Sequence, residues 1–152
     1  MRQECTLAGY NNSPPSTKER LMPKTRVYSP AVAEAPPGRW SNAIRAGAFL
    51  FISGQVSRSS DGSTIEGKGE YEQAKIIFTK IRNLVEAAGG TTDDVVRVTI
   101  YVVDIKQNKE VWRARQEFFV GDFPASTLVE VSALGTPEVL VEIEAIAHIG
   151  DN

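Results

Sequence analysis

The most regular hydrophobic pattern in the chain lies between Tyr71 and Ala88. Apolar residues recur there at intervals of three and four, which places them on one face of an amphipathic helix. This stripe consists of Ala74, Ile77, Phe78, Ile81, Leu84, Val85 and Ala88. Gly89-Gly90 follows the stripe, and glycine readily takes the left-handed conformation that ends many helices. We therefore predict a helix over 71–88 that buries one face against a sheet.

Runs of alternating and β-branched residues predict five strands. These strands cover residues 40–45, 49–55, 95–104, 126–134 and 138–149. A second helix is indicated over 109–120, where Val111, Ala114 and Phe118 share one face and Asn108 is placed to cap the N-terminus. The order β-β-α-β-α-β-β predicts an α+β domain with a mixed sheet and both helices on one of its faces.

The N-terminal part of the chain differs in composition from the rest. Residues 1–28 are mostly polar, and we expect them to form a flexible arm before a single folded domain over 29–152. No apolar run reaches the length of a signal peptide core or a membrane span, so we expect a cytoplasmic protein without membrane contact.

The side chains of the predicted strands divide between two faces of the sheet. In the last strand, Val139, Val141, Ile143, Ala145, Ala147 and Ile149 point one way, which we expect to be toward the helices. In strand 95–104 the same face should hold Val96, Val98, Ile100 and Val102. The opposite face is mixed, with Arg97, Thr99, Tyr101, Glu130, Glu142, Glu144 and His148 among Leu128, Leu140 and Ile146.

This mixed face raises the question of what covers it. A solvated sheet face would carry fewer aliphatic residues, and the core of a monomer would carry fewer charges. An oligomer interface that includes charge pairs and a cleft accommodates both kinds of residue. We therefore predict that the carboxylates face a neighbouring subunit or a site formed with it.

Composition excludes several kinds of function. One cysteine and one histidine in 152 residues argue against a metal site built from these ligands. A net charge of −2 and the absence of a basic stripe argue against a nucleic-acid partner.

Three stretches of the chain carry a family resemblance. They are AIRAGAFLFISGQV (43–56), NLVEAAGGTTDDVVRVTIYVVD (83–104), and FPASTLVEV with VEIEAIA (123–131 and 141–147). In these stretches the chain resembles the RidA/YjgF/YER057c/UK114 family of reactive-intermediate deaminases. The resemblance extends over nearly all of the chain from about residue 39.

The resemblance implies a chorismate-mutase-like fold and a homotrimer whose sheets form a barrel, with a cleft between each pair of subunits. It implies hydrolysis of enamines and imines, small-molecule substrates such as 2-aminoacrylate, to 2-oxo acids and ammonia. It also implies that the reaction needs no metal or organic cofactor.

The site implied by the resemblance is partly altered in this chain. Glu142 matches the glutamate that positions or activates water, and Ser53, Gly54 and Gln55 match the Ser-Gly-Gln that the family carries in its second strand. Ser126 stands where the family carries the arginine that binds the substrate carboxylate. Trp40 and Trp112 stand at positions that are usually tyrosine and asparagine. The implied catalytic residue is Glu142, and the implied substrate-binding residues are Trp40, Ser53, Gly54, Trp112, Ser126 and Leu128.

These changes remove a cation and add indole surface, so we expect a preference for larger, flatter ligands. Three functions stay open: a hydrolase of labile C–N intermediates, a pathway-specific enzyme that catalyses elimination, cyclisation or another hydrolysis, and a trimer that binds a small ligand without catalysis. Glu142 also has a structural alternative, a charge pair with Arg97 or with an arginine of a neighbouring subunit.

Overall fold

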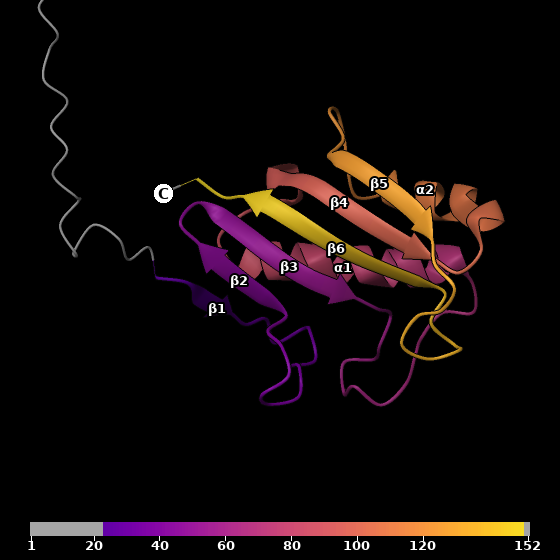
Figure 1. Ribbon diagram of the computed structural model, residues 1–152. Helices are drawn as coiled ribbons and strands as arrows, with labels where there is room; N and C mark the ends of the chain where they lie inside the picture. Colours follow the sequence, from indigo (N-terminus) through magenta and orange to yellow (C-terminus); the bar gives the residue numbers. More distant parts are fainter. Residues whose placement is uncertain (1–22, 151–152) are drawn as a thin grey trace, which may run out of the picture.

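The computed structural model describes residues 23–150 and has an α+β fold. A single six-stranded sheet has the strand order β1-β2-β3-β6-β4-β5. The strands are β1 Thr25–Val27, β2 Ala43–Ala46, β3 Phe49–Gln55, β4 Val95–Val102, β5 Ala125–Glu130 and β6 Val141–His148. Two α-helices, α1 Glu70–Ala87 and α2 Asn108–Arg115, lie on the same face of the sheet (Figure 1).

The connections follow the order predicted from the sequence. β2 and β3 form an antiparallel hairpin, and Gly47 in its turn takes a φ of 59° that favours glycine. β4 and β5 are parallel, because α2 carries the chain back across the sheet between them. β6 lies between β3 and β4 and is antiparallel to both. The predicted mixed sheet with both helices on one side is confirmed.

The core lies between α1 and the sheet. All seven residues of the predicted helical stripe are buried, and Gly89 takes a φ of 89° just after the helix. The predicted inward face of β6 is also buried, with Val141, Ile143 and Ala147 fully inaccessible to solvent. Burial of these side chains provides most of the hydrophobic stabilisation of the domain.

Several predicted boundaries are wrong. The chain from 25 to 27 was expected in a flexible arm, yet it pairs with β2 as an edge strand; residues 1–22 of that arm lie outside the described residues. The second helix ends at Arg115 rather than near 120, and the strands predicted over 126–134 and 138–149 shorten to β5 and β6. Short polar segments at element ends carry little periodicity, which is why sequence patterns place such boundaries poorly.

Val96 does not lie on the helix-facing side of β4. The pairing of β4 with β6 shifts between Val95 and Arg97, so that Val96 is the extra residue of a β-bulge. Val95 is buried in its place, and Val96 is 44% exposed. Strict alternation, assumed from the sequence, fails at this bulge.

The faces of β5 are also opposite to those predicted. In the parallel pairing with β4, Leu128 lies beside Ile100 and Glu130 beside Val102, and both β4 partners are buried under the helices. Leu128 packs against the core, and the Glu130 carboxylate accepts a hydrogen bond from the Ile105 amide at 2.8 Å. Leu128 and Val129 are adjacent and both apolar, so the sequence did not mark which of them faces inward.

The open face of the sheet, away from the helices, carries large apolar side chains. Phe49, Phe51 and Val129 are 44%, 46% and 39% exposed. Glu142 and Glu144 lie on the same face, opposite Tyr101 and Thr99 of β4. An exposed apolar surface of this kind marks a binding or assembly surface.

Candidate functional site

A β-bulge in β3 is the structural centre of the candidate site. Ile52 pairs with Ala145, but Gln55 pairs with Ile143, so the Ser53-Gly54 segment has one residue more than β6 opposite it. The Ser53 amide donates to the Asn42 carbonyl at 2.9 Å, and its hydroxyl donates to the Ser41 carbonyl at 2.7 Å. These bonds fix the bulge to the chain segment that enters β2.

Gly54 lies directly against the carboxylate of Glu142. A Cβ atom built on Gly54 would be 2.0 Å from Glu142 Oε1, far inside van der Waals contact. Only glycine therefore leaves room for the carboxylate in this position. The pair of residues that the sequence placed in the site, Gly54 and Glu142, is brought together by the fold.

Glu142 is a half-buried carboxylate that has no compensating cation among residues 23–150. Burial, and then the neighbouring charge of Glu144, raise the pKa of the Glu142 carboxyl group above its usual value. Within residues 23–150, no hydrogen bond or ion pair joins it to Arg97 or to another residue. The alternative prediction of a charge pair between Glu142 and Arg97 in the same chain is therefore wrong. A raised pKa favours a carboxyl group that accepts a proton in one step and releases it in another.

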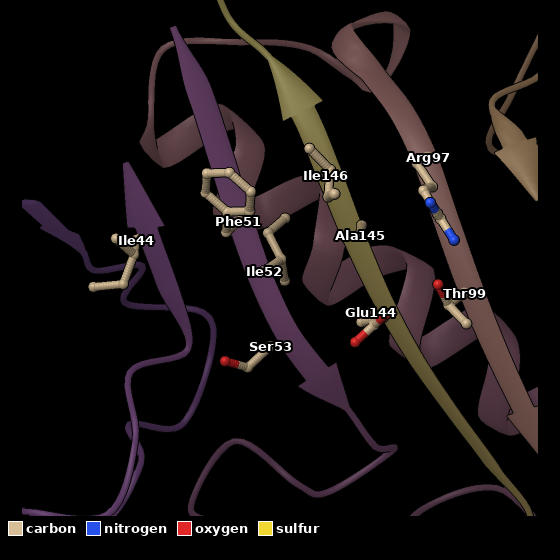
Figure 2. A pocket seen from close by; sticks show the side chains of 9 residues that line it. All are labelled: Ile44, Phe51, Ile52, Ser53, Arg97, Thr99, Glu144, Ala145 and Ile146. Atoms are coloured by element: carbon tan, nitrogen blue, oxygen red, sulfur yellow. The ribbon is translucent and has the colours of Figure 1, made fainter. Parts of the chain in front are cut away.

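A hollow of about 470 Å³ lies beside the bulge on the open face (Figure 2). Its lining residues are Ile44, Phe51, Ile52, Ser53, Arg97, Thr99, Glu144, Ala145 and Ile146. Figure 2 shows apolar side chains of β2, β3 and β6 on one side and Arg97, Thr99 and Glu144 on the other. Glu142 does not line this hollow, which is a shallow surface over the sheet.

A second cavity, of about 310 Å³, lies at the other side of the bulge. It is lined by Ala33, Glu34, Ala35, Pro36, Arg39, Trp40, Asn42, Gly54, Gln55, Val56, Arg58, Gly62 and Lys80. We call it the Arg39–Arg58 cavity. Trp40 and Gly54, two of the predicted binding residues, both line this cavity. Arg58 and Lys80 also line the cavity, but neither residue belongs to a recognisable sequence motif that would indicate this position.

The other predicted binding residues lie at the opposite edge of the sheet. Trp112 is on α2 and is 43% exposed, and Ser126 and Leu128 are on the edge strand β5. Ser126 pairs with the buried Val98, so its side chain projects from the helix side of the sheet, whereas Glu142 is on the open face. In the sheet order β3-β6-β4-β5, Gly54 and Glu142 lie on β3 and β6, and Ser126 and Leu128 lie on β5, with β4 between the two groups. The predicted site residues of one chain therefore fall into two separate groups.

His148, the histidine of the open sheet face, packs against an aromatic neighbour. His148 packs edge-on against Phe49 with ring centroids 5.1 Å apart. Among residues 23–150, no group of three or more His, Cys, Asp or Glu side chains could hold a metal ion. In the same part of the chain, no helix is both long enough and apolar enough to cross a membrane.

Comparisons with known proteins identify the family. A family model described as Endoribonuclease L-PSP matches residues 31–149. A RutC family protein of Pyrococcus horikoshii is 38% identical over 116 residues, which are 76% of this chain and 91% of that protein. RidA from an Antarctic Psychrobacter has a TM-score of 0.74 at 30% identity, and the match covers 82% of this chain and 99% of RidA. The chain belongs to the RidA/YjgF family.

A further solved member of the RidA/YjgF family has the same architecture. The Rid family protein YyfA of Yersinia pestis has a TM-score of 0.77 at 31% identity, covering 84% of this chain and all of that one. The resemblance seen in the sequence motifs is therefore confirmed at the level of family and fold.

Proposed function

We propose that this protein hydrolyses an enamine or imine to a carbonyl compound and ammonia, with Glu142 as the group that handles protons. The observation that carries the proposal is the half-buried, unpaired carboxylate of Glu142 held against the backbone of Gly54. Membership of the RidA/YjgF family supports the same class of reaction.

The proposed reaction needs one carboxyl group in two protonation states. Glu142 as carboxylate takes a proton from water while the water oxygen bonds to the imine carbon, and it passes this proton to the nitrogen to give a carbinolamine. The carboxylate then takes the proton of the carbinolamine hydroxyl and gives it to the nitrogen. The C–N bond breaks as the C–O bond becomes a carbonyl, ammonia leaves, and Glu142 is again a carboxylate. A raised pKa suits a group that must act as base and then as acid.

We propose that the site is completed by a second subunit in a homotrimer. Trp112, Ser126 and Leu128 lie at one edge of the sheet, and Trp40, Ser53, Gly54 and Glu142 lie toward the other side. Association through the apolar open face would cover Phe49 and Phe51 and would allow the α2–β5 edge of one chain to approach the Glu142 half-site of its neighbour.

The substrate is proposed to be larger or flatter than 2-aminoacrylate. Serine at position 126 offers a single hydroxyl, whereas an arginine would form two parallel bonds to a carboxylate. The exposed indoles of Trp40 and Trp112 offer apolar surface for a planar ligand.

The test is a coupled hydrolysis assay. A PLP-dependent dehydratase generates 2-aminoacrylate or a larger imine, and release of the 2-oxo acid and of ammonia is timed with and without the protein. We expect acceleration of both, and a loss of about 100-fold or more in Glu142→Gln. Glu86→Gln is the matched control, since Glu86 is an exposed carboxylate on α1, away from the open face of the sheet. Equal rates for wild type and Glu142→Gln would reject the assigned role.

A specific observation keeps one other function under test. The two half-sites expose tryptophans where a small imine would not need them, which would fit a pathway-specific enzyme that catalyses elimination or cyclisation. Turnover without release of ammonia would identify that alternative. RNA cleavage is not favoured, because a net charge of −2 gives little attraction for a phosphate backbone.

A further inference from the structure

Three cationic residues line the Arg39–Arg58 cavity. Arg39, Arg58 and Lys80 reach it from three different segments of the chain. Glu34 is the acidic residue in its lining, and its carboxylate is paired with Arg26 at 2.7 Å. The cavity therefore has an excess of positive charge in a protein whose net charge is −2.

Two of the three cations have donors available for a ligand. Within residues 23–150 the exposed Arg39 guanidinium has no hydrogen-bond or ion-pair partner. Arg58 donates through Nη1 to the Gly62 carbonyl at 3.3 Å. The other N–H groups of its guanidinium remain available to a ligand. Lys80 is different, because its ammonium group donates to the carbonyls of Val56 at 2.9 Å and Arg58 at 2.5 Å.

The wall that carries Arg58 is held in place by its own contacts. The Lys80 ammonium fixes the backbone at Arg58, and the turn after it is closed by Asp61. The Asp61 carboxylate accepts bonds from the Ser59 hydroxyl at 2.6 Å and from the Ser63 amide at 2.9 Å. These bonds, with that from the Ser63 hydroxyl, lower the pKa of Asp61 to about 2. A preorganised cationic wall costs little ordering when an anion binds.

The cavity borders the backbone against which Glu142 lies, although Glu142 itself does not line it. Gly54 forms part of its lining, and the Glu142 carboxylate lies against Gly54. Trp40, which is 50% exposed, provides an apolar wall in the same cavity. A volume of about 310 Å³ is at the lower end of the range for small-molecule sites.

We propose that the Arg39–Arg58 cavity binds the carboxylate of a planar, ring-sized substrate, with Arg39 and Arg58 on the carboxylate and Trp40 along the ring. The cavity would thereby supply the cation that Ser126 does not. This inference rests on the proposed function for the identity of the ligand as substrate, but binding of the anion can be measured separately from turnover.

The experiment is a calorimetric titration of the full-length protein with benzoate, with benzamide and with inorganic phosphate at constant ionic strength. We expect benzoate to bind at least about 10-fold more tightly than benzamide, because a charged hydrogen bond contributes more than a neutral one. Arg39→Gln and Arg58→Gln should each weaken benzoate binding by about 10-fold. Arg82→Gln is the matched control, because Arg82 is on α1 away from the cavity and should leave binding unchanged.

The outcomes separate the two proposals. Equal binding of benzoate and benzamide, no benzoate binding at millimolar concentration, or equal affinities of all three arginine variants would overturn the inference. Stronger binding of phosphate than of benzoate would reject a carboxylate as the ligand. If Glu142→Gln binds benzoate as the wild type does while imine turnover is unaffected by this change, the proposed function fails and the anion site stands.

Discussion

Gly54 controls the position of the carboxylate on which the proposed chemistry depends. The extra residue in β3 brings its backbone to the Glu142 side chain, and the absence of a Cβ lets the carboxylate lie there. The nearest atoms to a new Cβ would be the flexible end of Glu142 rather than backbone. A small side chain at position 54 should therefore move the carboxylate without disturbing the core.

Gly54→Ala is expected to lower kcat/KM for imine hydrolysis by at least about 10-fold with little change in thermal stability, because misplacing a catalytic group costs rate rather than folding energy. Gly69→Ala is the control, since Gly69 has an extended backbone and no atom within 4 Å of a new Cβ. Wild-type turnover by Gly54→Ala would show that the contact with Gly54 does not position Glu142.

Glu142 also makes a prediction about stability and pH. Its carboxyl pKa is raised in the folded chain by burial and by Glu144. At a pH between the ordinary and the raised pKa, the folded state therefore retains a proton that the unfolded state has lost. Stability contributed by this group is therefore lost as pH rises from the ordinary glutamate pKa through the raised value. Glu142→Gln should therefore have a larger free energy of unfolding than wild type at pH 7. We expect a difference of less than about 1 kcal/mol, because solvent screens a half-exposed charge. The difference should shrink at pH 4, where the glutamate is protonated in a larger fraction of the molecules.

Urea unfolding at both pH values measures this difference, with Glu144→Gln as the comparison. If Glu142→Gln were less stable than wild type at pH 7, the carboxylate would have a stabilising partner in the assembled protein.

Among the elements, those with strong periodicity were predictable and those at the edges were not. The stripe of α1 and the inward face of β6 were identified because both bury one face against the same core. β1 is only three residues long, and β5 is an edge strand with exposed residues on both faces, so neither has a pattern that reveals its register. The Glu142–Gly54 contact depends on a bulge, which alternation cannot foresee. Arg58 and Lys80 joined the site through tertiary contacts that no local pattern records.

The link between α1 and the loop after β3 depends on Lys80. Its ammonium group is buried, and burial lowers the pKa of Lys80. Lys80→Met should reduce the free energy of unfolding by about 1–3 kcal/mol, because it leaves the carbonyls of Val56 and Arg58 without a donor. Denaturant titration tests this, with the exposed helix residue Lys75→Met as control. Equal stability of the two variants would mean that water replaces the ammonium group at no cost.

At the scale of the whole molecule, the open sheet face is the feature that a single chain leaves unexplained. It combines exposed Phe49 and Phe51 with the two carboxylates Glu142 and Glu144. We propose that the group around Gly54 and Glu142 and the group on α2 and β5 act only together, so assembly and chemistry are parts of one proposal.

Phe51→Glu is expected to convert the proposed homotrimer to monomers, because it places a charge in the proposed apolar contact. The far-ultraviolet circular dichroism should not change, since Phe51 is already 46% exposed in the single chain. Light scattering gives the mass, and Val120→Glu is the control because Val120 is the most exposed large apolar residue among those described, at 83%. A monomeric wild type, or a Phe51→Glu trimer, would contradict the assignment of this face.

The most direct test of the central claim, a site shared between subunits, is a complementation assay of imine hydrolysis. Glu142→Gln disables one half-site, and Ser126→Asp disables the other by placing a charge without a partner in the proposed cleft. Each variant alone should be inactive, but trimers reassembled from equal amounts of both should regain activity, since roughly a quarter of their interfaces combine two intact halves. No recovery from mixed trimers of demonstrated composition would contradict the account, because it would mean that both residues must belong to the same chain.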